Sequence, residues 1–147
     1  MAITILLCLA FQIAGCSSVR DQRSEDKRLN IAVMGSKQVY DYDTSFLNGV
    51  EMAVNDFNKQ YSQSGFIANY EIYDDEYDFE KGVVIAKQLS TDPEITAVIG
   101  SHSFNILDAS VDFFEDSGKI LIAANGMMDK SITNKKYKYI FRNTFGE

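Results

Sequence analysis

The stretch LNIAVMG, Leu29–Gly35, decides the fold. It is a short apolar run that includes β-branched residues and ends on a glycine, and such a run predicts a buried strand. Behind it, from the capping residues Asp43 or Thr44, apolar side chains recur at spacings of three and four, which predicts a helix with one buried face. The residues of this core stripe are Phe46, Val50, Ala53, Val54, Phe57 and Tyr61.

The same strand-and-helix unit repeats along the chain. Asn69–Glu76 alternates between polar and apolar residues and predicts a second strand, and Pro93 closes the connection to the next one. Between this strand and Pro93, Asp78 is placed to cap a helix whose apolar residues include Phe79, Val83, Ala86 and Leu89. Three more strands are expected at Ile95–Gly100, Lys119–Ala124 and Tyr137–Asn143, with a helical stripe at Leu107, Val111 and Phe114 and a short helix at 128–133.

Strict alternation of strands and helices predicts a doubly wound α/β fold with a parallel sheet covered on both faces. The expected strand order is 2-1-3-4-5. Ligands of such sheets bind at the carboxyl ends of the strands, beside the point where the strand order reverses. The loops that follow strands one, three and four are therefore the candidate site, at Gly35–Asp43, Gly100–Asn105 and Ala123–Met128.

Composition and charge limit the possible functions. The 147 residues, 46% hydrophobic and 24% charged, are typical of one compact domain. Fourteen Lys and Arg against 21 Asp and Glu give a net charge of −7, which argues against nucleic acid as a partner. The basic cluster Asn134–Lys138 is interpreted as a solvated loop.

The candidate loops carry no recognisable catalytic or nucleotide-binding motif. The loop after the first strand has neither GxGxxG nor the GxxxxGK of a P-loop, and Gly100 stands where a phospho-receiver domain needs an aspartate. His102 has no triad partner that the sequence reveals, so we expect no enzyme, no catalytic residue and no cofactor. The acidic stretch Tyr73–Glu80 lacks the EF-hand spacing and is interpreted as a solvated loop without a metal.

Polar and aromatic side chains of two loops are the candidate ligand contacts. Ser101 and Ser103 offer hydroxyls beside the start of a helix, which suits a carboxylate or another anion, although either serine could instead only cap that helix. Tyr40 and Tyr42 could stack on a ligand or pack over the sheet edge, and helix capping is the simplest role for Asp43.

The N-terminal segment predicts export and lipid anchoring. Ala2–Ile13 is apolar apart from Thr4 and Gln12 and is too short to span a bilayer, so residues 1–15 are interpreted as a signal peptide. Ile13–Cys16 resembles the bacterial lipobox, which implies a diacylglyceryl group on Cys16, with 16–28 as a polar tether to the membrane and 29–147 as the folded domain. Cys8 would leave with the signal peptide, and no disulfide would remain. No Lys or Arg precedes the apolar run, which a start codon placed too far downstream would explain; a cytosolic chain with a buried N-terminal segment is the alternative.

The order and spacing of six segments resemble the type 1 periplasmic binding proteins, in particular the leucine/isoleucine/valine-binding branch, over Leu29–Glu147. These segments are LNIAVMG, NGVEMAVNDFN, YEIYDDEYDFEKGVVIAKQL, ITAVIGSHSFN, DFFEDSGKILIAA and YIFRNTFGE. The resemblance implies two lobes that close on a small, amino-acid-like ligand and present it to an ABC permease. It identifies this chain as most of the N-terminal lobe, which would bind weakly alone because one lobe supplies half of the cleft.

The resemblance also carries over specific positions. An aromatic wall after strand one matches Tyr42, and the hydroxyl-bearing loop after strand three matches Ser103, Phe104 and Asn105. The loop after strand four matches Asn125, Gly126 and Met127. Phe104 stands at the usual serine position, so this bulkier side chain and Met127 would favour a more apolar or differently shaped ligand, or indicate that binding is lost.

Two functions follow from this interpretation. The first is a lipid-anchored receptor in the cell envelope, facing the periplasm or the cell exterior, for an ABC importer of amino acids or similar small polar or anionic ligands. The alternative is an envelope lipoprotein that uses the same fold as a regulatory or scaffolding module.

Overall fold

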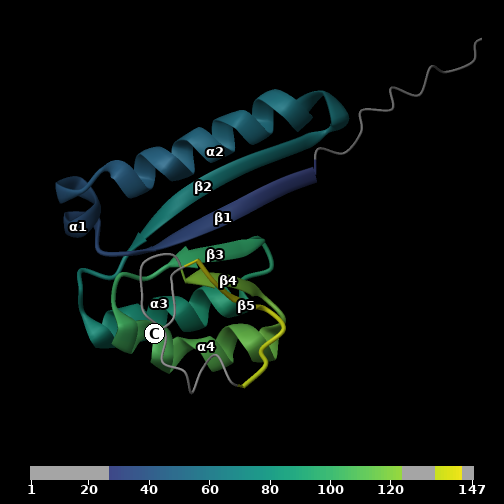
Figure 1. The fold of residues 1–147 in the computed structure, drawn as a ribbon. Helices are drawn as coiled ribbons and strands as arrows, with labels where there is room; N and C mark the ends of the chain where they lie inside the picture. The colour runs from purple at the N-terminus through teal and green to yellow at the C-terminus, as the bar shows by residue number, and fades with distance from the viewer. Residues whose placement is uncertain (1–26, 124–134, 144–147) are drawn as a thin grey trace, which may run out of the picture.

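The computed structural model describes residues 27–123 and 135–143 as one α/β unit built on a parallel sheet (Figure 1). The strands are β1 (Lys27–Gly35), β2 (Phe66–Asp74), β3 (Ala97–Gly100), β4 (Ile120–Ala123) and β5 (Ile140–Arg142). They lie in the order β2-β1-β3-β4-β5, and every neighbouring pair is parallel. The predicted fold class and strand order are confirmed.

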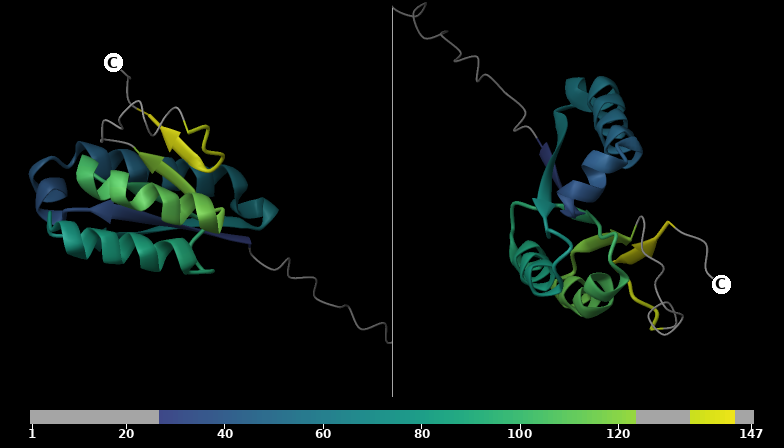
Figure 2. Two further views of the ribbon diagram at one scale, coloured as in Figure 1. Left: turned by 90° about the horizontal axis from the view of Figure 1, so that it is seen from below. Right: turned by 90° about the vertical axis from the view of Figure 1, so that its left-hand side faces the viewer.

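Helices cover both faces of the sheet. They are α1 (Lys37–Tyr42), α2 (Ser45–Tyr61), the short 3-10 helix η1 (Ser62–Ser64), α3 (Phe79–Thr91) and α4 (Phe104–Ser117). Helix α2 runs along β2 and β1 on one face, whereas α3 and α4 lie side by side on the other face (Figures 1 and 2). None of the helices in residues 27–123 and 135–143 is both long and apolar enough to cross a membrane.

The larger part of the core lies between the sheet and the helices α3 and α4. Their apolar stripes pack onto one face of β1, β3 and β4, as predicted, because these helices bury residues at spacings of three and four. Asp78 caps α3 as expected, its carboxylate accepting from the Lys81 N–H at 2.7 Å. The buried residues of this cluster are Ala32, Met34, Ala86, Leu89, Ile95, Val98, Ile106, Leu107, Val111, Phe114, Leu121 and Ala123.

Two predicted core stripes are only partly buried. In α2, Val50 is buried, but Ala53 and Tyr61 are exposed. In α3, Phe79 is 52% exposed. These assignments were wrong because α2 lies over β1 and β2 with only the short α1 beside it among the described α-helices, and because Phe79 is the first residue of its helix.

Several boundaries differ from the prediction. A helix that was not expected, α1, occupies Lys37–Tyr42 in what was predicted to be a loop. β1 begins at Lys27, within the predicted tether, and β2 spans Phe66–Asp74 instead of 69–76. The short helix predicted at 128–133 and the lipidation residue Cys16 lie outside the described residues.

Candidate functional site

The carboxyl ends of β1 and β3 meet where the strand order reverses, and Gly35 and Gly100 lie at this edge. Gly100 pairs with Met34 of β1, and a Cβ on Gly100 would collide with the Met34 carbonyl oxygen. A glycine is therefore required for the two strands to lie this close. The loops that follow, Ser36 in one and Ser101 in the other, begin with buried serines.

Three aromatic rings pack together beside this edge. Tyr40 of α1 stacks on Phe46 of α2 at 5.3 Å between ring centroids, and His102 from the loop after β3 meets Tyr40 edge-on at 4.7 Å. The Tyr40 hydroxyl donates to the Met34 carbonyl at 3.0 Å. The cluster thus joins the loop after β1 to the loop after β3 through side chains.

Burial sets the protonation of this aromatic cluster. It raises the pKa of the Tyr40 hydroxyl, and the nearby Asp75 charge raises it further, so Tyr40 acts as a neutral hydrogen-bond donor. Burial lowers the pKa of His102, while the charges of Asp75 and Asp43 oppose that effect. Hydrogen bonds from Ser45 hold the pKa of Asp43 below its usual range.

The two tyrosines of the first loop have different environments. Tyr40 is 1% exposed and belongs to the core on the α2 side, together with Val33 and Val50. Tyr42, two residues later at the end of α1, is 95% exposed. Of the two tyrosines, Tyr42 alone has a side chain that is accessible to a ligand, and its proposed stacking role stays a prediction.

The loop after β3 brings four of the predicted residues together at the start of α4. Ser103 is the N-cap of α4 without a side-chain capping bond, while Phe104 is half-buried and Asn105 is exposed. Ser101 is 1% exposed, and its hydroxyl oxygen accepts from the Ser103 N–H at 3.2 Å. The first N–H groups of a helix lack partners within the helix, so the start of α4 can bind an anion. Asn125, Gly126 and Met127 lie outside the described residues.

The end of β2 and the turn after it hold two carboxylates that the sequence did not single out. Asp75 is 1% exposed and accepts from the Ser101 hydroxyl at 3.1 Å, whereas its neighbour Asp74 accepts from the Lys37 N–H at 2.9 Å. The interpretation of Tyr73–Glu80 as a solvated loop was therefore wrong for Asp75, and also at its ends, because 73–74 belong to β2 and 79–80 begin α3. Its position directly after a strand end, beside a second aspartate, was the available signal.

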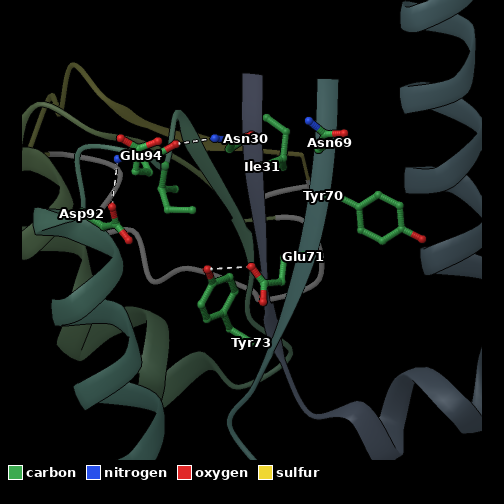
Figure 3. A pocket seen from close by; sticks show the side chains of 9 residues that line it. Asn30, Ile31, Asn69, Tyr70, Glu71, Tyr73, Asp92 and Glu94 are labelled. Carbon is green, nitrogen blue, oxygen red and sulfur yellow. Dashed lines mark hydrogen bonds between the residues drawn. The ribbon is translucent and has the colours of Figure 1, made fainter. Parts of the chain in front are cut away.

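A hollow of about 440 Å³ lies away from this edge, between β1, β2 and the turn that leads into β3 (Figure 3). Its polar groups largely bind one another, since the Asn30 side chain donates to the Glu94 carbonyl at 2.9 Å and Tyr73 donates to Glu71 at 3.1 Å. In the described part of the chain, no three His, Cys, Asp or Glu residues are grouped to hold a metal ion. The edge at β1 and β3 is thus the better candidate site.

Comparison with known proteins identifies the family. Residues 34–146 match the family model described as periplasmic binding protein. No protein with a curated description matches the sequence.

Solved structures of substrate-binding proteins have the same fold. An ABC transporter substrate-binding protein from Desulfitobacterium hafniense, in complex with Leu, is 26% identical with a TM-score of 0.72, over 82% of this chain and 35% of that one. The branched-chain amino acid transporter substrate-binding protein LivJ from Streptococcus pneumoniae, in complex with isoleucine, is 22% identical with a TM-score of 0.67, over 82% and 34%. A solute-binding protein from R. palustris, in complex with 4-hydroxybenzoate, is 16% identical with a TM-score of 0.62, over 82% and 32%. The chain spans about a third of the length of these proteins.

Proposed function

The chain belongs to the periplasmic binding protein family, and from that premise we propose that it is the N-terminal lobe of a solute-binding receptor for an ABC importer. The single observation that carries the proposal is the match of residues 34–146 to the family model. The sheet order and the similarity in fold to substrate-binding proteins support it. The permease and an extracytoplasmic location are parts of the same proposal.

We propose a ligand with a carboxylate and an apolar body. Leucine, isoleucine and 4-hydroxybenzoate, the molecules bound by three of the similar structures, share these two features. In this chain the start of α4, with Ser103 and Asn105, would bind the carboxylate through N–H and side-chain groups. The half-buried Phe104 beside them and the exposed Tyr42 would contact the apolar body.

A titration with a matched pair of ligands tests this proposal. Adding L-leucine to the ¹⁵N-labelled chain should shift the amide signals of Gly100–Asn105 in a saturable manner. Leucinamide, which has the same side chain but no carboxylate, should shift them much less. Affinity should be weak, because one lobe supplies half of a closing cleft. If L-leucine, L-isoleucine and 4-hydroxybenzoate all leave these signals unchanged at millimolar concentration, the proposed ligand class is refuted and the scaffolding alternative is favoured.

An Asn105→Ala variant tests whether the ligand binds at the start of α4. Asn105 is exposed, so its loss should leave the fold intact and weaken L-leucine binding. The exposed Asn48 of α2 provides a matched control, because Asn48→Ala removes the same side chain from another surface. Equal affinity of the two variants would place the ligand elsewhere.

We further propose that Cys16 anchors the receptor in the membrane through a lipid. The apolar run Ala2–Ile13 and the small residues before the cysteine support this. In a bacterial host, the wild-type chain should incorporate labelled palmitate and partition into detergent, and Cys16→Ser should abolish both. Cys8→Ser, the matched control, should have no effect, and labelling that persists in Cys16→Ser would exclude this anchor.

A further inference from the structure

Asp75 is a buried carboxylate in the turn after β2, and both of its oxygens accept hydrogen bonds. Oδ1 accepts from the Tyr77 N–H at 2.9 Å, and Oδ2 accepts from the Ser101 hydroxyl at 3.1 Å. At 1% exposure, a carboxylate is retained at a considerable desolvation cost unless such donors compensate for it. A neutral side chain would avoid that desolvation cost. The presence of a carboxylate at this position therefore indicates that its hydrogen bond to Ser101 has a role.

The bond to Ser101 continues to the start of α4. A serine hydroxyl has one hydrogen to donate, and here Asp75 receives it. The lone pairs of Ser101 then remain available, and one of them accepts from the Ser103 N–H at 3.2 Å. Because Ser103 is the N-cap of α4, these two hydrogen bonds connect Asp75 to the residue at which this helix begins.

The preceding residue, Asp74, makes the corresponding connection to the other loop of the site. Its Oδ1 accepts from the Lys37 N–H at the start of α1 and from the Glu76 N–H, each at 2.9 Å. Adjacent carboxylates, Asp74 at the end of β2 and Asp75 at the start of the turn, therefore hydrogen-bond to the loops after β1 and after β3. The strand β2 is itself not adjacent to β3.

We propose that Asp75 is the positioning residue of the ligand site: through Ser101 it holds the loop 100–103 and the first turn of α4 in place before a ligand binds. The part that concerns the ligand rests on the receptor function proposed above. Asp75 acts through its hydrogen bonds and does not contact the ligand, since its side chain is buried beneath the loop. Prior ordering of a site raises affinity by reducing the entropy lost on binding.

Amide hydrogen exchange of the full 147-residue chain tests the positioning without a ligand. Asp75→Ala should accelerate exchange of the Ser103 amide by about tenfold, the effect of losing one hydrogen-bonded connection, and leave the Lys37 amide unchanged. Asp74→Ala, the matched control, should accelerate Lys37 and leave Ser103 unchanged. Amides of Val98 in the buried strand β3 should stay protected in both variants, which verifies the fold.

The variant Asp75→Asn distinguishes positioning through hydrogen bonds from an effect of the negative charge. In Asp75→Asn, the side-chain carbonyl can accept from Tyr77 and the amide can donate to Ser101, so Ser103 protection should remain close to that of the wild type. A role of the negative charge alone predicts that the Asn and Ala variants behave alike, and that result would overturn the proposal. If Asp75→Ala does not fold, Asp75→Ser, whose side chain is one bond shorter, tests the same connection and must also accelerate exchange of the Ser103 amide.

A titration with L-leucine as the probe completes the test. Asp75→Ala should weaken binding by about tenfold relative to wild type, with Asp75→Asn close to wild type and Asp74→Ala less affected than Asp75→Ala. If the wild-type chain does not bind L-leucine but Ser103 exchange responds as expected, the receptor function fails for this probe and the positioning stands. If Ser103 exchange changes but all variants bind L-leucine equally, the role of Asp75 in the ligand site is refuted.

Discussion

The two faces of the sheet are packed to different extents. On the face covered by α3 and α4, Val98, Leu107 and Phe114 are fully buried. On the face covered by α2, the buried cluster among the described residues consists of Val33, Tyr40 and Val50. Beyond it, Phe141 of β5 is 52% exposed, and an apolar hollow of about 200 Å³ lies between α2 and the strands.

Because of this difference, the residues that contribute most to stability are not those of the candidate site. Burial of apolar surface is the main favourable contribution to folding, so the α3 and α4 face supplies most of it. The aromatic cluster of Tyr40, Phe46 and His102 lies on the α2 side, where polar contacts hold the loops. Substitutions on the first face should therefore change stability most, and those on the second should change the site at a smaller cost.

The largest effect is expected from Phe114→Ala. Phe114 is 0% exposed in the core beneath α4, and its truncation should lower the free energy of unfolding by about 3–5 kcal/mol. Phe57→Ala on α2 removes the same ring from a half-buried position and should cost about 1 kcal/mol. Urea unfolding of both variants measures the difference, with Phe114→Leu as a milder variant if Phe114→Ala does not fold. Equal costs would show that the two faces contribute alike.

Replacing a glycine by alanine should have opposite effects on the stability of the domain in the helices of the two faces. A Cβ on Gly82 of α3 would lie 2.6 Å from the Cδ1 of Ile106, which is buried between α3 and α4. Gly82→Ala should therefore destabilise the domain by about 1–2 kcal/mol, since the overpacking exceeds the gain in helix propensity. Gly49 of α2 has no atom within 4 Å of such a Cβ, so Gly49→Ala should stabilise by about 0.5–1 kcal/mol. Thermal unfolding of the two variants measures these changes in stability. Stabilisation by both substitutions would contradict tight packing of α3 on α4.

Tyr40→Phe tests how far one polar contact stabilises the α2 side. The substitution keeps the ring but removes the hydroxyl that donates to the Met34 carbonyl at 3.0 Å, and it should cost about 1 kcal/mol. The half-buried Tyr70 of β2 packs against the same cluster, and Tyr70→Phe should have an effect below about 0.5 kcal/mol. Urea unfolding measures the free energy of unfolding of both variants. An equal, small decrease in the two would mean that the Tyr40 hydroxyl contributes nothing to stability.

The sequence predicted what depends on periodicity and missed what depends on contacts between distant residues. The alternation of strands and helical stripes was sufficient for the sheet order, because each crossover has one allowed hand. Helix α1 has six residues, too few to show a helical period, so Tyr40 and Tyr42 could not be told apart. Buried Asp75 accepts a hydrogen bond from Ser101, a residue 26 positions away, and no local pattern reveals this contact.

The smallest expected effect is a dependence on pH that originates on the α2 side. Burial lowers the pKa of His102 in the folded chain below its value in the unfolded chain, although Asp75 and Asp43 oppose the shift. The unfolded chain therefore takes up the proton first as the pH falls, and the His102 contribution to stability, complete above the unfolded pKa of about 6.5, is lost on acidification.

His102→Phe isolates this contribution. Phenylalanine keeps an aromatic ring against Tyr40 and Phe46, whose centroids lie 4.7 and 5.8 Å from that of His102, but it cannot titrate. Between about pH 7.5 and pH 5.5, the urea midpoint of the wild type should fall more than that of the variant. Since the core cluster beneath α3 and α4 consists of apolar side chains, this difference would locate the acid-sensitive packing on the α2 face. Parallel pH profiles would instead assign the sensitivity to the carboxylates that both proteins share.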